Sequence, residues 1–344
     1  MKKLVTSLAL AGAAVLPLAG HAQEVKGPKV DWNITVWGNP RAFTAGMELI
    51  SKEIIAKTGG AFTIKTVYGS VLSPERENLD NIKIGSIDGA FICTGYHPGK
   101  NPGMTVLDLP FLPTPTFEIQ ETVAEAVYHH PFILAEMKKW NAWPYMAAIL
   151  PQYEFMGIGK PPLTLEDWKG KRVRALAGIG EAMRALGATV ASVTAPELYT
   201  SMDRGLVDAA SLPSTYALAS YKLHEISKWY TSNLAPGANN CGVVLSLTAL
   251  GKLPPQYKTL LDSLKPAGYA ALKAAYKAAD DKNIPMFNKT LKPITYPESE
   301  LEKFHKIGGK PVWDKWVKEQ SAKGVPAQEL LDLVMNTAKK ASGK

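Results

Sequence analysis

Short segments with strand-like and helix-like patterns of hydrophobic residues alternate along the first hundred residues. Residues 32–37 and 62–67 alternate between apolar and polar side chains and are rich in β-formers, which predicts two strands. Residues 44–57 place apolar side chains at helical spacing and stop at a Gly-Gly pair that can form a left-handed cap. A second helix over 73–85 opens with Ser-Pro-Glu and ends in glycine, and a third strand follows over 87–93.

The same order of elements returns later in the chain. The pattern predicts a strand over 172–176, a helix over 179–186 and a strand over 189–193. Thr194 and Glu197 have the spacing of a capping box, and the helix that they open ends at Gly205. This repetition predicts two α/β lobes of related plan, with the ligand between them.

The remaining segments predict several crossings between the lobes. Residues 117–141 are helical and are broken or kinked at Pro131, and residues 242–247 form a further strand. A long helical stretch follows over 256–283. Pro266 allows either a kink or a second helix that begins there, and Pro285 is expected to end the stretch.

The N-terminal residues have the pattern of an export signal. Two lysines precede an apolar run over 4–18, and small residues follow up to Ala22. We expect residues 1–22 to be removed by cleavage near Ala22. An uncleaved anchor is the alternative, but the run is shorter than the ~20 residues that span a bilayer, and no other segment is suited to span one.

Composition and charge narrow the class of protein. The 344 residues suggest two domains, and 46% hydrophobic with 20% charged residues excludes disordered and polytopic membrane proteins. The formal charge of +8 comes from 39 Lys+Arg and 31 Asp+Glu; losing Lys2 and Lys3 leaves 37 against 31, or +6. The lysines are spread out and near the end alternate with acids, which favours solvated helix faces over a nucleic-acid surface.

Motifs for enzymatic chemistry are absent from the sequence. The histidines form no zinc-type pair with an intervening glutamate, and there is neither a G-x-S-x-G elbow nor a phosphate-binding loop. Gly178-Ile179-Gly180 has the place of a dinucleotide site, but Met183 replaces its third glycine. We therefore predict no catalytic residue, no cofactor and no metal.

The two cysteines, Cys93 and Cys241, lie in apolar strand-like runs. An oxidising compartment permits a disulfide between them. The apolar surroundings favour buried free thiols instead.

Arg174 is the first candidate for a ligand contact. It falls near the carboxyl end of a predicted strand, where open α/β lobes present their ligands. A guanidinium in this place can bind a carboxylate through two parallel hydrogen bonds. The alternative is an arginine paired with a neighbouring acid.

Four segments behind the export signal carry a resemblance to a known family. In order, they are Pro74-Glu75-Arg76 with Gly85-x-Ile87-Asp88, Leu107-Asp108-Leu109-Pro110-Phe111-Leu112, Glu166-Asp167-Trp168-Lys169-Gly170-Lys171-Arg172-Val173-Arg174, and Glu197-Leu198-Tyr199-Thr200 leading to Gly205-Leu206-Val207-Asp208. Over nearly the whole mature chain, this order resembles the periplasmic substrate-binding proteins of tripartite ATP-independent (TRAP) transporters, the DctP-like family.

The resemblance implies a two-lobed α/β fold, the type II venus-flytrap periplasmic binding protein, with a long helix bridging both lobes. The expected parts are lobe I over 26–150 and 238–255, lobe II over 151–237 and 285–344, and the bridging helix over 256–283. Such proteins bind small organic anions and deliver them to a permease of one small and one large membrane subunit. The family's carboxylate-binding arginine follows a Lys-Gly-x-basic-x-Arg pattern, which falls on Arg174.

Further ligand-binding positions are expected where strands end or where the chain enters a lobe, although ordinary lobe packing is the alternative for each. These positions are Trp37, Asn39, Arg41, Tyr96, Tyr153, Glu154, Ser211, Leu212 and Asn239. Family members that bind acidic sugars often have a second arginine near Glu154 and a polar or tryptophan contact at Leu212. A glutamate at 154 predicts a ligand with one carboxylate and with a hydroxyl or amino group facing Glu154. Residues 236–240 faintly resemble members that bind keto acids with a metal ion, but we predict no metal from them.

The function expected from the sequence is capture of a small organic acid, a monocarboxylate with a hydroxyl, keto or amino group, by an exported protein of the periplasm. The protein would have no direct membrane span and would act with a TRAP permease. One alternative is an exported enzyme that acts on small carboxylic acids in the same cleft. Another is a receptor for a different transporter or a sensor kinase.

Overall fold

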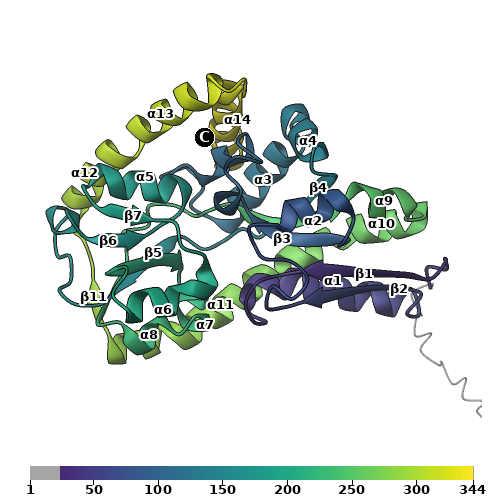
Figure 1. Ribbon diagram of the computed structural model, residues 1–344, viewed down its shortest axis with the longest axis horizontal. Helices are drawn as coiled ribbons and strands as arrows, with labels where there is room; N and C mark the ends of the chain where they lie inside the picture. The colour runs from purple at the N-terminus through teal and green to yellow at the C-terminus, as the bar shows by residue number, and fades with distance from the viewer. Residues whose placement is uncertain (1–23, 344) are drawn as a thin grey trace, which may run out of the picture.

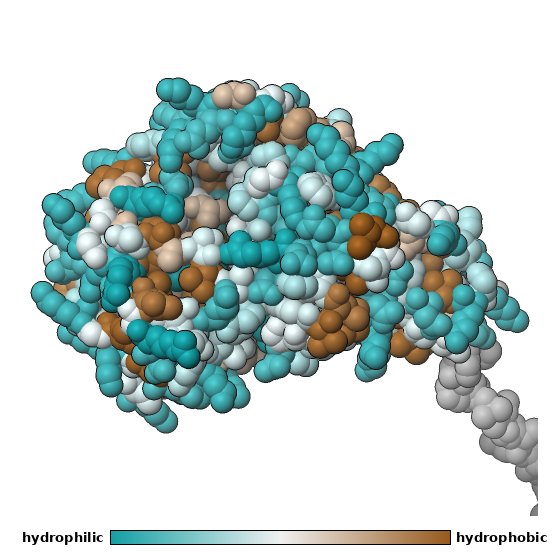
Figure 2. All heavy atoms as spheres, in the orientation of Figure 1, coloured by the Kyte–Doolittle hydropathy of each residue, from teal (hydrophilic) through white to brown (hydrophobic). Residues whose placement is uncertain are grey.

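The computed structural model describes residues 24–343, so the expected export signal lies outside the described residues. Two β-sheets, each covered by helices, form two lobes that lie side by side (Figure 1). Polar side chains cover most of the face in Figure 2, and hydrophobic residues appear there in scattered patches. The mixed α/β, two-lobed fold class expected from the sequence is confirmed.

The sheet of lobe I has the strand order β2-β1-β3-β10-β4. Its strands are β1 (Val30–Thr35), β2 (Phe62–Val67), β3 (Gly89–Cys93), β4 (Ala142–Ala147) and β10 (Cys241–Ser246). β1 pairs in parallel with β2 and β3, whereas β10 is antiparallel to β3 and β4. The late strand β10 therefore lies in the lobe I sheet between the early strands β3 and β4.

The sheet of lobe II has the order β11-β9-β5-β8-β6-β7. Its strands are β5 (Tyr153–Gly157), β6 (Arg172–Arg174), β7 (Thr189–Ala191), β8 (Ala209–Pro213), β9 (Trp229–Thr231) and β11 (Lys292–Ile294). The central strands β5 and β8 are antiparallel and are buried along their whole length. Burial on both faces explains their nearly continuous apolar sequences.

The helices cover these sheets, and most have boundaries close to those that the apolar pattern predicts. The helix expected from residue 73 begins at Asn78, because residues 75–77 form a turn. The early helices are α1 (Ala45–Lys57), α2 (Asn78–Ile84), α3 (Phe117–Tyr128) and α4 (Pro131–Lys138). The helices between β6 and β10 are α5 (Ala177–Ala185), α6 (Leu198–Asp203), α7 (Tyr216–Ser220) and α8 (Leu223–Ile226). The later helices are α9 (Leu247–Lys252), α10 (Pro255–Ser263), α11 (Lys265–Thr290), α12 (Glu298–Gly308), α13 (Lys310–Ser321) and α14 (Ala327–Ala341). The capping box forms as predicted, because the Glu197 carboxylate accepts hydrogen bonds from the Thr194 backbone N–H at 3.1 Å and from its hydroxyl at 2.6 Å.

The long helix α11 runs from one lobe to the other (Figure 1), and it packs against α1 of lobe I and α7 of lobe II. Pro266 lies in its first turn, so a second helix starts there and α10 is separate. The prediction that Pro285 ends the stretch is wrong, because α11 continues to Thr290. Pro285 is exposed, and water can satisfy the carbonyl whose helical partner is missing.

The last helices contact both lobes. α12 and α13 pack against α5 of lobe II, and α14 packs against α3 of lobe I. Two indole N–H groups of α13 also reach lobe I, from Trp313 to the Pro110 carbonyl at 2.7 Å and from Trp316 to the Thr105 hydroxyl at 2.8 Å. The range 285–344, expected in lobe II, therefore ends against lobe I.

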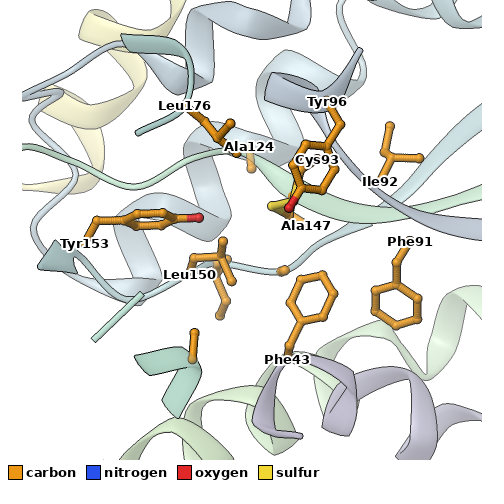
Figure 3. Packing of buried hydrophobic residues seen from close by; sticks show 14 of the residues in the cluster. Phe43, Phe91, Ile92, Cys93, Tyr96, Ala124, Ala147, Leu150, Tyr153 and Leu176 are labelled. Carbon is orange, nitrogen blue, oxygen red and sulfur yellow. A yellow bond between two sulfur atoms is a disulfide. The ribbon is translucent and has the colours of Figure 1, made fainter. Parts of the chain in front are cut away.

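The two cysteines form a disulfide, which corrects the preference for free thiols. Cys93 and Cys241 are directly opposite each other in the antiparallel pairing of β3 with β10. Their apolar surroundings indicated burial, but only this register shows that the two thiols meet. The bridge joins the last residue of β3 to the first residue of β10, and Figure 3 labels Cys93.

Candidate functional site

Arg174 is buried in the cleft at the carboxyl end of β6, and 1% of it is exposed. Its Nε donates to the Val193 carbonyl at 2.8 Å and its Nη1 to the Ser211 carbonyl at 2.7 Å. These partners are carbonyls, so the pairing with a neighbouring acid that the sequence left open is not formed. The two bonds fix the guanidinium, and its Nη2 makes no hydrogen bond to the described residues. Arg174 is therefore a cation whose position is fixed by two carbonyls and whose Nη2 N–H groups remain available to an anion.

A cavity between the lobes lies against Arg174, and most of its other lining residues are aromatic or aliphatic. Phe43, Tyr96, Leu150, Tyr153 and Leu176 are among them, and Figure 3 labels these side chains in one region of the buried packing. The lining also includes Trp37, Arg41, Cys93, Ala195, Leu212, Pro213, Tyr216, Ala217, Tyr221 and Cys241. The free space is about 30 Å³, room for no more than about two water molecules. The lobes are therefore packed closely around it, and a ligand with an apolar body would need them to move apart.

The second cation of the cavity, Arg41, is held among aromatic rings of both lobes. Its Nη1 donates to the Trp37 and Asn39 carbonyls, each at 2.8 Å. Its guanidinium carbon lies 4.8 Å from the Phe43 ring centroid and 5.6 Å from that of Tyr221. Aromatic faces stabilise a cation electrostatically, so Arg41 joins the lobe I wall to the Tyr221 ring.

Asn39 and Glu154 do not line this cavity, which corrects two expectations from the sequence. Asn39 is exposed and contributes its backbone carbonyl to Arg41. Glu154 follows Tyr153 on β5, and neighbouring strand residues point to opposite faces. Its carboxylate accepts hydrogen bonds from the Thr231 hydroxyl and from the N–H groups of Leu234 at 3.2 Å and Ala235 at 3.0 Å. A ligand group facing Glu154 is therefore not supported.

Other expected positions divide between the cavity and its support. Trp37, Tyr96, Tyr153 and Leu212 line it, together with Arg41 and Arg174. Ser211 supports it from behind, because its carbonyl accepts from Arg174 and its hydroxyl donates to the Arg174 carbonyl at 3.3 Å. Burial raises the pKa of Tyr153 above its usual value and that of Tyr221 to about 12. Both hydroxyls are neutral donors at pH 7.

Asn239 lies in a neighbouring cavity behind the crossing segments, which shares Leu150 and Cys241 with the first. Its side chain is buried, and neither its nitrogen nor its oxygen has a partner among the described residues. A buried amide without partners is costly. Asn239 does not line the cavity at Arg174, but its side chain lies beside Tyr153, which does.

The sequence prediction missed several cavity residues, chiefly Phe43, Leu150, Leu176, Tyr216 and Tyr221. Tyr216 begins the short helix α7 and Tyr221 follows its end, shortly after β8. The rule that ligands meet the carboxyl ends of strands would have pointed to this segment. Leu150 and Leu176 resemble ordinary core residues in sequence and carry no such signal.

Two further observations concern the described part of the chain. No helix within residues 24–343 combines the length and the hydrophobicity needed to cross a membrane. Over the same range, no three His, Cys, Asp or Glu side chains come together as possible ligands of one metal ion.

Two α/β lobes around a cleft with a buried arginine define the class of a two-lobed binding protein. The model of the bacterial extracellular solute-binding protein family 7, DctP, matches residues 35–320, and the chain belongs to this family. The resemblance to TRAP solute-binding proteins that the sequence suggested is therefore confirmed.

Known proteins share the fold at low sequence identity. A monocarboxylate 2-oxoacid-binding periplasmic protein of Nostoc sp. is 25% identical over 240 residues, which cover 68% of this chain and 64% of that relative. The crystal structure of a TRAP solute-binding protein from Rhodoferax ferrireducens with copurified benzoate aligns with a TM-score of 0.79 and 20% identity, over 92% of this chain and 99% of that one. A protein of Bordetella bronchiseptica with bound (R)- and (S)-mandelate aligns at 0.76 with 20% identity, over 90% and 99%. At these identities the structures establish the fold alone.

Proposed function

We propose that this TRAP solute-binding protein captures a monocarboxylate with a compact apolar or aromatic body between its lobes. The observation that carries the proposal is the buried Arg174 guanidinium, held by two carbonyls with donors free at the cavity. A carboxylate bound there would form charge-assisted hydrogen bonds in a site sheltered from water.

The other lining residues support one carboxylate rather than two. Among them Arg41 is the other cation, but carbonyls already occupy its Nη1 and aromatic rings surround it. The rings of Trp37, Phe43 and Tyr96 offer contact area for an aromatic or aliphatic body. The neutral hydroxyls of Tyr153 and Tyr221 favour a hydroxyl or keto group on the ligand, whereas the amino group expected opposite Glu154 loses its support.

Replacing the cavity arginine tests this proposal. We expect Arg174→Ala to weaken binding by at least ~2 kcal/mol, about 30-fold, because a buried carboxylate loses its partner. Titration calorimetry with benzoate, 3-hydroxybenzoate, mandelate and small 2-oxoacids measures the loss, after native mass spectrometry of the isolated protein has shown which acid it carries.

Arg172→Ala is the matched control for that experiment. Arg172 lies on the same strand, is exposed, and pairs with Asp208 instead of lining the cavity. Its replacement should leave affinity unchanged. Binding that survives Arg174→Ala at full strength would contradict the proposed role. Recovery of the bound acid unaltered after long incubation would favour transport over turnover.

The proposed partner is a TRAP permease with one small and one large membrane subunit, and the proposed compartment is the periplasm. Family membership supports both, as does the sequence pattern of residues 1–22. Reconstituted small and large subunits should take up the bound acid when this protein is added. Uptake that is independent of the protein would contradict the partnership.

A further inference from the structure

One short segment of lobe II, residues 192–195, receives contacts from lobe I on both sides. The Arg76 Nη2, from the turn before α2, donates to the Ser192 carbonyl at 2.7 Å. The backbone N–H of Ala195 donates to the Tyr96 hydroxyl at 2.9 Å. Both bonds cross from one lobe to the other, so they form only when the lobes are together.

The same segment also holds the ligand arginine. The Val193 carbonyl, between these two contacts, accepts the hydrogen bond from Arg174 Nε at 2.8 Å. Ser192, Val193 and Ala195 thus each make a hydrogen bond: Val193 to Arg174, which is proposed to bind the ligand, and the other two to residues of lobe I. A shift of Arg174 and a separation of the lobes act on the same stretch of backbone.

Arg76 and Tyr96 are themselves in contact. The guanidinium carbon of Arg76 lies 5.4 Å from the centroid of the Tyr96 ring, a cation–π distance. Tyr96 is buried and lines the cavity, whereas Arg76 is exposed and does not. Nearby packing between the lobes is close, since a Cβ on Gly95 would lie 3.2 Å from Leu176 Cβ. Arg76 therefore lies on the outer side of the interlobe contact.

We propose that Arg76 is a positioning residue that holds the lobes together over the bound ligand without touching it. Its hydrogen bond to Ser192 favours the closed arrangement in which residues 192–195 support Arg174, and its contact with Tyr96, within lobe I, keeps both side chains beside that segment. When only the closed form binds tightly, apparent affinity scales with the fraction of protein that closes. The role of Arg76 in affinity rests on the proposed function, but its role in holding the lobes does not.

Stopped-flow and calorimetric measurements with benzoate test the effect on binding. The two interlobe hydrogen bonds, from Arg76 to Ser192 and from Ala195 to Tyr96, are called the clasp below. We expect Arg76→Ala to weaken binding about tenfold, mainly through faster dissociation, because the clasp acts after the ligand has docked. Arg204→Ala is the matched control, since Arg204 is exposed and its side chain makes no hydrogen bond or ion pair with the described residues. Unchanged affinity in Arg76→Ala, or a loss that lies in the association rate and disappears at high salt, would overturn the proposal. The second result would indicate long-range attraction of the anion.

Hydrogen exchange without ligand tests the clasp itself. Peptides covering residues 192–195 should exchange faster in Arg76→Ala and in Tyr96→Phe, because the second change removes the acceptor of the Ala195 N–H. The double variant should show little more than the stronger single one, since both act on one segment. Unaltered exchange in both variants would overturn the proposal. If the wild type binds no acid of the panel, the proposed function fails while these exchange experiments still test the clasp.

Discussion

At the scale of single residues, three buried carboxylic acids outside the ligand cavity link loop segments. Asp108 accepts from the Asn240 N–H at 2.6 Å, Glu136 from the Gly103 N–H at 2.8 Å, and Glu154 from the Ala235 N–H at 3.0 Å. Burial raises the pKa of each to about 7, from usual values of 3.8 for Asp and 4.5 for Glu. The folded protein therefore holds these protons more tightly than the unfolded chain does between about pH 4 and 7.

This difference predicts that the free energy of unfolding falls as the pH rises from 5 to 8. The unfolded chain gives up these protons first, so rising pH favours the unfolded state. Glu154→Gln should flatten the dependence by on the order of 1 kcal/mol or more, measured by urea unfolding at several pH values. The exposed Glu302→Gln is the control. A stability that climbs from pH 5 to 8, or an unchanged slope in Glu154→Gln, would count against this assignment.

The residues of the site divide by what a local pattern can predict. Arg174 could be predicted to lie at the cavity because the end of a strand and a motif both point to it. Glu154 could not be separated from Tyr153, because adjacent strand residues face opposite sides and the sequence does not say which side is the cleft. Tyr221 reaches the cavity only because lobe II meets lobe I, and a Cβ on Gly38 would come within 2.9 Å of its hydroxyl. Such contacts depend on tertiary arrangement.

At the scale of elements, the local sequence pattern predicted where most helices lie, but it did not predict which distant strands pair. Strand 62–67 has the bounds of β2, and Gly85 adopts the left-handed φ of 77° that a glycine cap requires. The strand that follows α6 is β8 at Ala209–Pro213, because a turn first occupies the residues after that helix. The disulfide needs the register of β3 against β10, which are distant in the sequence. The spacing of apolar residues within one strand cannot predict its register with a strand so distant in the sequence.

The disulfide should contribute measurably to stability. It closes a loop with a sequence separation of 148 residues between two central strands, and removing such a bridge costs about 2–4 kcal/mol, in part by enlarging the unfolded ensemble. We expect thermal unfolding monitored by circular dichroism to shift to lower temperature for Cys93→Ala/Cys241→Ala. Wild type with reductant should approach the same midpoint, and a double variant as stable as wild type would refute the expectation.

At the scale of the whole molecule, the lobes are joined by three chain crossings and by packing of the last helices. The chain crosses between the sheets from β4 to β5, from β9 to β10 and along α11 (Figure 1). In addition, α13 packs against α5 of lobe II and α14 packs against α3 of lobe I. The cavity, Arg76 and the segment 192–195 lie where the lobes meet. A hinge movement about the crossings would expose the cavity and break the interlobe hydrogen bonds of Arg76 and Tyr96 in the same motion.

Ligand should shift this equilibrium toward the compact form. A ligand stabilises closure only as far as it binds the closed form better than the open one, and here Arg174 and the lobe I rings contribute together to the closed cavity. Small-angle scattering should show a smaller radius of gyration for wild type with saturating benzoate than without it, and no such change for Arg174→Ala. Arg76→Ala should compact less than wild type at the same fractional saturation. Equal compaction in all three proteins would mean that closure is set by the crossings alone and is independent of both arginines.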